Sequence, residues 1–185
     1  MSLFRPRPKL SIVVIVYKMP DQAEKTLLSL SPAYQQGVRE KDYEVIVVEN
    51  HSDRLLGAAR ACQHASNVRY YHRQESQRSP VNAINFGAAQ ARGRYVAIMI
   101  DGARMLTPGV VRLTLSAFQA DPQAAVSAPG YHIGHKLQQV AVNEGYDEQA
   151  EAELLKSIAW PQDGYSLFDI AVLSGSCQGG FFQSN

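Results

Sequence analysis

The sequence predicts a doubly wound α/β fold, in which a mostly parallel sheet carries helices on both faces. Short apolar runs alternate along the chain with segments whose apolar residues recur at helical spacing. The first run, "LSIVVIV" at residues 10–16, hardly alternates between apolar and polar residues, which is typical of a parallel strand buried on both faces. We therefore expect one domain over residues 10–185, preceded by a flexible tail over residues 1–9.

The remaining elements follow from the same two patterns. Further strands are expected at residues 43–48, 68–71 and 95–100, and weaker apolar runs indicate strands at 124–130 and 167–173. Helices are expected to begin at Pro20, after a cap at Ser52 or Asp53, at Ser79 and Pro80, and after Thr107 and Pro108. In the helix that begins at Ser79 and Pro80, we expect Val81, Ile84 and Ala88 to face inward. A last helix is expected over residues 144–158. This order predicts a parallel sheet with crossover helices.

Composition and charge exclude several classes of function. The chain has 185 residues, is 45% hydrophobic and carries a net charge of +1, so we expect no nucleic-acid partner and no broad grip on an anionic membrane. Its longest apolar run is too short to cross a bilayer, so no transmembrane segment is expected in this chain. Cys62 and Cys177 form neither a disulfide framework nor a zinc signature, which indicates a reducing, cytoplasmic location.

Polar and aromatic residues follow three of the expected strands. They are Tyr17 and Lys18 after the first strand, Glu49, Asn50 and His51 after the second, and Asp101, Gly102, Ala103 and Arg104 after the fourth. Because the carboxyl ends of parallel strands face one edge of a sheet, we expect these side chains to converge there. Such a set suits a nucleotide: Tyr17 can flank a base, Glu49 or Asn50 can pair with its polar edge, and Asp101 can bind ribose hydroxyls or a metal.

The turn after the first strand, "YKMPDQ", contains no glycine. Neither the dinucleotide-binding fingerprint nor a P-loop is therefore present, since both need glycines where the backbone approaches phosphates. This absence counts against other nucleotide-dependent enzymes with a doubly wound sheet.

Three stretches, taken in order, resemble the family 2 glycosyltransferases of the GT-A fold. They are "LSIVVIVYKMPDQAEKTLLSL", "YEVIVVENHSD" and "NAINFGAAQARGRYVAIMIDGARMLTPG", which span about residues 10–109. The resemblance implies a GT-A nucleotide-binding domain that lacks part of its acceptor-side C-terminal region. It also implies an inverting hexosyl or other glycosyl transferase. The donor would be a nucleotide sugar, a UDP-sugar before other nucleotides, and the acceptor a saccharide or another hydroxyl compound.

The resemblance further implies where the donor binds. The family's nucleotide-sugar contacts fall on Val16, Tyr17, Glu49, Asn50, Arg78, Asn82, Asp101, Gly102, Ala103 and Arg104. In the family, the second acid of an Asp-X-Asp motif helps to hold a divalent ion, and this sequence has Ala103 at that position. Either Asp101 alone holds Mg²⁺ or Mn²⁺, or a cation such as Arg104 takes the place of the metal.

The general base cannot be assigned from the sequence. In the family this acid lies well past the Asp-X-Asp motif, and here the last acids are Asp163 and Asp169, neither of which lies in a matching motif. We expect the natural protein to continue beyond Asn185, or to lack the base. The alternative function is therefore a non-catalytic nucleotide- or sugar-binding module on a GT-A scaffold, which Ala103 also favours.

Each candidate residue has a structural alternative. Asp101, Glu49 and Asn50 are also typical turn formers, and Tyr17 can pack beneath a loop. Arg78 can be a solvated surface arginine.

Overall fold

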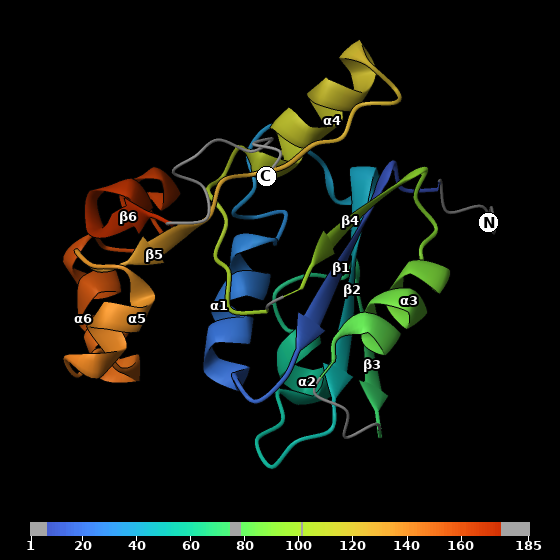
Figure 1. The fold of residues 1–185 in the computed structure, drawn as a ribbon. Coiled ribbons are helices and arrows are strands. Elements are labelled where there is room, and N and C mark those ends of the chain that lie inside the picture. Colours follow the sequence, from blue (N-terminus) through green and yellow to red (C-terminus); the bar gives the residue numbers. More distant parts are fainter. Residues whose placement is uncertain (1–6, 75–78, 101, 175–185) are drawn as a thin grey trace, which may run out of the picture. The chain divides into compact units, whose positions relative to one another are not determined.

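The computed structural model describes residues 7–74, 79–100 and 102–174 (Figure 1). The chain divides into two compact units, residues 1–115 and residues 116–185. Within the described ranges, no helix has both the length and the apolar character needed to cross a membrane.

The first unit is built on a four-stranded parallel sheet with the strand order β3-β2-β1-β4. Its strands are β1 (Leu10–Val16), β2 (Tyr43–Asn50), β3 (Val68–Arg73) and β4 (Tyr95–Met99). β1 and β2 are buried along their whole length, as their apolar runs predict. The register pairs Val16 with Glu49 and Asn50 with Arg73, so β1, β2 and β3 finish at one edge of the sheet.

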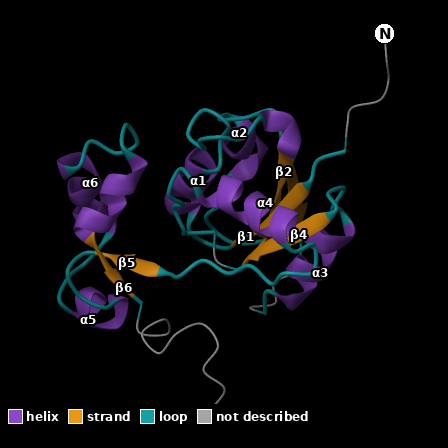
Figure 2. Cartoon of the chain, turned by 90° about the horizontal axis from the view of Figure 1, so that it is seen from above, coloured by secondary structure: helices purple, strands orange, loops and turns teal. Residues whose placement is uncertain are grey.

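Helices cover both faces of this sheet (Figures 1 and 2). α1 (Pro20–Ser29) and α2 (Gly57–Cys62) cover one face, and α3 (Val81–Ala89) covers the other. A 3-10 turn, η1 (Glu40–Asp42), precedes β2, and α4 (Val110–Ala120) follows β4 in the chain. Right-handed crossovers require this division, because the chain moves from β1 to β3 in one direction and returns past β1 to reach β4. The doubly wound α/β class is confirmed.

α3 packs on the sheet through small residues. Ala83 and Gly87 are buried, whereas Val81 is 54% exposed and Ala88 is also exposed, so the prediction that Val81 and Ala88 face inward is wrong. A Cβ added to Gly87 would lie only 2.3 Å from Cγ1 of Val13. At Gly87 the helix therefore lies too close to β1 for a larger side chain, whereas Ile84 packs against the core as predicted.

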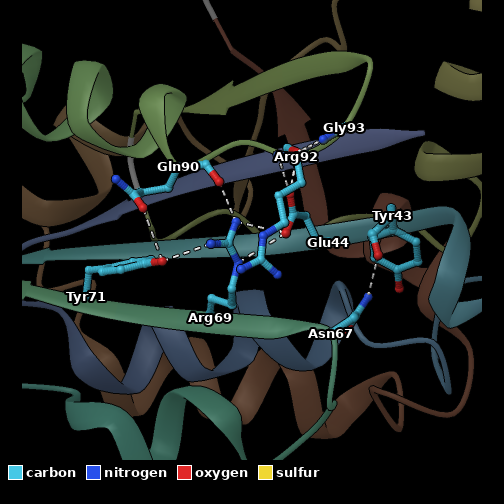
Figure 3. A network of polar contacts seen from close by, with 9 residues as sticks. Tyr43, Glu44, Asn67, Arg69, Tyr71, Gln90, Arg92 and Gly93 are labelled. Atoms are coloured by element: carbon cyan, nitrogen blue, oxygen red, sulfur yellow. Dashed lines mark hydrogen bonds and ion pairs between the residues drawn. The ribbon is translucent and has the colours of Figure 1, made fainter. Parts of the chain in front are cut away.

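A polar network joins the amino ends of the strands (Figure 3). The Glu44 carboxylate of β2 accepts hydrogen bonds from the Ser11 hydroxyl (2.6 Å), from the Arg69 guanidinium (2.9 Å) and from the backbone N–H of Arg92 (2.8 Å). The backbone N–H of Gly93 in turn donates to the Ser11 hydroxyl (2.8 Å). These contacts tie β1, β2 and β3 to the turn that enters β4.

Between residues 131 and 174, the second unit contains an antiparallel pair of short strands and three short helices. They are β5 (Tyr131–Ile133), β6 (Ala171–Leu173), α5 (Gln138–Asn143), α6 (Glu148–Ser157) and the 3-10 helix η2 (Gly164–Ile170). The helix expected over residues 144–158 is present as α6, and Asp147 caps it by accepting hydrogen bonds from the N–H groups of Gln149 and Ala150.

Two strand predictions in the second unit are wrong in whole or in part. Residues 124–130, all of which the structure describes, contain no strand, and Pro129 within them has no N–H to offer to a ladder. In the run at 167–173 only the last residues form β6, because the earlier ones belong to η2.

Candidate functional site

Residues from three strands meet at the carboxyl edge of the sheet in the first unit. Val16 at the end of β1 pairs with Glu49 near the end of β2. Gly102, which follows β4, lies against β1, because a Cβ added to it would be 2.9 Å from the carbonyl oxygen of Ile15 and 3.0 Å from Cγ2 of Val16. Only glycine fits there without displacement. The structure thus brings together Val16, Asn50 and Gly102, which are far apart in the sequence.

The carboxylate of Glu49 holds the loop that follows β2. Glu49 is fully buried. Its Oε1 accepts the N–H of Leu56 (2.7 Å), and its Oε2 accepts the N–H of Gly57 (3.1 Å) and the hydroxyl of Tyr70 (2.6 Å). Burial, together with this hydrogen bond to Glu49, raises the pKa of Tyr70. In this structure both carboxylate oxygens of Glu49 therefore serve the chain itself.

This arrangement also corrects the predicted start of α2. The helix begins at Gly57, with Leu56 as its N-cap residue, and no side chain of Ser52 or Asp53 caps it. Glu49 supplies the acceptor from a distance in sequence, which a local capping pattern could not reveal.

Asn50 lies beside Glu49 and has a different environment. The residue is 5% exposed, and its Oδ1 is buried and has no hydrogen-bond partner among the described residues. An unpaired buried acceptor costs about 1–3 kcal/mol. Because Asn50 lies at the end of β2, a hydrogen-bond donor of a ligand bound at this edge could satisfy its Oδ1 and remove this cost.

The turn after β1 adopts a strained backbone conformation. Lys18 has a φ of 64°, in the left-handed region that few residues other than glycine adopt. Its Nζ lies 3.5 Å from the Asp53 carboxylate and 5.6 Å from the centre of the Tyr17 ring, and Tyr17 itself is half-buried. Lys18 thus takes the conformation that glycine would supply in a glycine-rich turn. Strain of this kind is often concentrated at ligand sites.

The remaining candidates lie around this edge or outside the described residues. Ala103 is half-buried, and the side chain of Arg104 is exposed two residues beyond Gly102. Asn82 is exposed in the first turn of α3. Arg78 and Asp101 lie outside the described residues, so the structure does not place them.

A cavity whose lining residues come mainly from β3 was not predicted from the sequence. The cavity is open, has a volume of about 600 Å³ and is lined by Tyr70, Tyr71, His72, Arg73 and Gln74, together with Phe86 of α3. Arg73 lies over the Phe86 ring at 4.6 Å, and the Tyr71 ring meets the same ring edge-on at 5.2 Å. The His72 ring lies 5.5 Å from that of His51, which follows β2. The short run "VRYY" predicted the strand but not this cavity.

The described residues do not fit a divalent metal ion by themselves. No group of three or more His, Cys, Asp or Glu residues within them could hold an ion. The methyl side chain of Ala103 cannot ligate a metal, and the Asp53 carboxylate is paired with Lys18. A metal would therefore need a ligand from outside the described residues, for which the sequence offers Asp101.

Asp163 has a structural role in the second unit. Its Oδ1 accepts the N–H of Tyr165 (3.0 Å) and its Oδ2 accepts the hydroxyl of Ser166 (3.1 Å), which caps η2. These contacts give the acid at this position a structural role as the cap of η2.

The parallel sheet with helices on both faces is an α/β fold of the GT-A type. The family profile described as Glycosyl transferase family 2 matches residues 11–183, and the chain belongs to this family. The resemblance drawn from the sequence is thereby confirmed. A search of curated proteins gives no significant match.

The solved structures that are similar to this chain include the following two. TarS from S. aureus, residues 1–349, superposes with a TM-score of 0.54 at 17% identity and covers 70% of this chain and 42% of that chain. The mannosyltransferase PcManGT from Pyrobaculum calidifontis, in complex with GDP-Man and Mn²⁺, gives a TM-score of 0.47 at 24% identity and covers 75% and 38%. The chain thus spans about two fifths of the length of these two structures. The likeness to TarS supports the fold.

Proposed function

We propose that this chain is the donor-binding part of an inverting glycosyltransferase that uses a nucleotide sugar. The family supports sugar transfer, and we favour a UDP-sugar as donor and a saccharide or other hydroxyl compound as acceptor. The observation that carries the proposal is Asn50, whose unpaired amide oxygen lies where the strand ends converge.

The proposed nucleoside site has a distinct part for each residue. Tyr17 flanks the base, and the Asn50 amide turns outward to accept an N–H from the polar edge of the base. Glu49 holds the loop that follows Asn50, because its carboxylate accepts the backbone N–H groups of Leu56 and Gly57. Val16, Asn82 and Arg78 complete the proposed contacts.

The proposed diphosphate site lies along residues 101–104. Glycosyl transfer expels a nucleoside diphosphate, so negative charge grows on it as the glycosidic bond breaks. The Arg104 guanidinium is suited to this charge, and a divalent ion on Asp101 would supply the same stabilisation. We favour Arg104, because its side chain is exposed and its backbone N–H is bonded to Thr26.

We assign no general base in this chain. Proton removal from the acceptor hydroxyl requires a carboxylate that faces the acceptor and acts as the base. The carboxylate of Asp163 accepts the hydrogen bonds that cap η2. We further propose a cytoplasmic location, which the exposed free thiol of Cys62 supports.

A binding screen tests the donor proposal. Thermal shift with UDP, GDP, CDP and ADP, each with Mn²⁺ and with EDTA, is expected to show stabilisation by at least one nucleoside diphosphate. Asn50→Ala is expected to abolish the shift. Asn67→Ala is the matched control, because Asn67 also has an unpaired buried Oδ1 among the described residues but lies beside the amino end of β3. Equal loss in both variants, or no shift with any nucleotide, contradicts the proposal.

A second candidate is a non-catalytic donor-binding module, which the methyl group at Ala103 favours. It differs from the first in one result: the whole protein binds the donor but neither transfers nor hydrolyses it when metal and acceptors are supplied. Ala103→Asp tests the motif placement. A gain of metal dependence in donor binding supports the placement, and unchanged metal affinity contradicts it.

A further inference from the structure

We propose that Thr26 and Ser29 of α1 are positioning residues that fix the backbone after β4 and so place the Arg104 guanidinium beside the donor's diphosphate. The inference rests on the proposed function, and it assigns a role to hydroxyl groups that lie outside the strand-end motifs.

Each hydroxyl makes two hydrogen bonds, one within α1 and one to the segment after β4. Thr26 Oγ1 donates to the carbonyl of Gln22 (3.1 Å) and accepts the N–H of Arg104 (2.8 Å). Ser29 Oγ donates to the carbonyl of Thr26 (2.7 Å) and accepts the N–H of Leu106 (3.0 Å). Both residues are fully buried. The hydroxyl protons are thus held within the helix, which leaves the oxygen lone pairs for the segment.

These positions would ordinarily favour apolar residues. The buried face of α1 also contains Ala23 and Leu27, and hydroxyl side chains within a helix bring little stability when they bond only to their own backbone. Residues 102–107 form no helix or strand in the structure, so their N–H groups need acceptors from elsewhere. Thr26 and Ser29, three residues apart on one helix face, supply acceptors to Arg104 and Leu106.

Gln35 fixes the far end of the same segment. Its Nε2 donates to the carbonyls of Ser29 (2.8 Å) and Thr107 (3.1 Å), and its Oε1 accepts the N–H of Val111 (3.2 Å). Gln35 is buried. At the near end, Gly102 fits closely beneath the carbonyl of Ile15. The backbone is therefore held at both ends.

The result is an exposed cationic side chain on a fixed backbone. Arg104 is exposed while its own N–H is bonded to Thr26. A guanidinium that starts from a fixed Cα loses less conformational freedom when it meets a phosphate, and fixed donors stabilise developing charge better than mobile ones. The hydroxyls of α1 would therefore act on the diphosphate through Arg104, without touching it.

The test compares the diphosphate with the nucleoside. We would measure by calorimetry the dissociation constants of UDP and uridine, or of another diphosphate and its nucleoside if the thermal screen selects one. Thr26→Val, which keeps the shape and removes the hydroxyl, is expected to weaken UDP about tenfold and uridine less than twofold. Thr26→Ser should restore UDP binding, and Ser29→Ala should behave like Thr26→Val.

A double-mutant cycle tests whether the hydroxyl acts through Arg104. Arg104→Ala is expected to weaken UDP as Thr26→Val does, and the double variant is expected to be no weaker than Arg104→Ala alone. Ser31→Ala is the matched control for loss of a buried hydroxyl, because Ser31 is buried and its Oγ has no partner among the described residues. It should leave UDP binding unchanged.

Three results would overturn the inference. They are additive losses in the cycle, equal weakening of uridine and UDP by Thr26→Val, and a loss in Ser31→Ala as large as that in Ser29→Ala. If Thr26→Val does not fold, Ser29→Ala takes its place in the double-mutant cycle with Arg104→Ala, and the same outcomes decide for or against the inference. Failure of the wild-type chain to bind any nucleoside diphosphate removes the proposed function itself, together with this inference.

Discussion

The two units of the chain are stabilised in different ways. In the first, β1 and β2 are buried from end to end and α3 packs closely against them through Ala83 and Gly87. In the second, β5 and β6 have three residues each, and the buried large side chains among the described residues are Leu155, Leu167 and Ile170. A continuous core fixes the first unit, whereas caps and short contacts fix the second. The candidate donor site lies on the first, where rigid strands can hold ligand contacts.

The largest expected effect is on the core of the first unit. Ile46→Ala should lower its free energy of unfolding by about 3–4 kcal/mol, because Ile46 is fully buried in β2 and the substitution leaves a cavity. Leu167→Ala in η2 should cost about 2 kcal/mol. Urea unfolding followed by hydrogen exchange separates the two units. If Leu167→Ala speeds exchange in β1 as much as in β6, the units unfold as one and the contrast between them is wrong.

The next effect concerns the loop that follows Asn50 at the end of β2. Glu49→Gln should destabilise the first unit by about 2 kcal/mol, because an amide cannot accept all the hydrogen bonds from Leu56, Gly57 and Tyr70. Tyr70→Phe removes one of these bonds and should cost about 1 kcal/mol. Thermal unfolding measures both. An unchanged melting temperature in Glu49→Gln would show that Glu49 does not hold the loop. Glu49 would then again be a candidate contact for the ligand.

Each unit has a non-glycine residue in the left-handed region, which allows a matched comparison. Lys18 in the first unit has a φ of 64° and Ala159 in the second has a φ of 50°. Lys18→Gly and Ala159→Gly should each stabilise their own unit by about 0.5–1 kcal/mol, since relief of strain exceeds the added entropy of the unfolded chain. Melting temperatures measured by circular dichroism decide the sign. A loss of stability in Lys18→Gly would mean that its contacts with Asp53 and Tyr17 outweigh the strain.

The smallest expected effect is on acid sensitivity. The hydrogen bond from the Arg39 guanidinium lowers the pKa of Asp42 to about 2, with Lys9 adding to it. A depressed carboxyl pKa stabilises the fold above the unfolded-state value near 4, and this contribution is lost as the pH falls from about 4 to 2. Because Lys9 and Arg39 are largely exposed, we expect a contribution of only about 0.5 kcal/mol. In Asp42→Asn, the free energy of unfolding of the first unit should depend less on pH between pH 4 and 2. An unchanged slope of that free energy against pH contradicts this role.

The sequence predicted the first unit well because its strands are long and apolar. β1, β2 and β4 were placed to within two residues, since a parallel strand buried on both faces needs a continuous apolar run. The inner face of α3 was predicted only in part: Ile84 packs against the core, but close packing selected Ala83 and Gly87 over the larger Val81. In the second unit, strands of three residues give too little periodicity to be recognised, and the apolar run at 167–170 forms a 3-10 helix instead.

The candidate site was predicted in outline but not in its details. The convergence of Val16, Asn50 and Gly102 follows from parallel topology, which the sequence indicated. The bonds of Glu49 to Leu56, Gly57 and Tyr70, and of Thr26 to Arg104, join residues far apart in sequence, and no local pattern marks them. Whether residues 10–185 form a single domain stays a prediction.

Hydrogen exchange with and without a saturating nucleoside diphosphate tests the central claim most directly. We expect protection at the strand ends of the first unit, in residues 16–18, 49–53 and 102–106, with residues 131–173 unchanged. Protection confined to the second unit, or to the amino ends of the strands around Glu44, would contradict the assignment of the donor site to the carboxyl edge of the sheet.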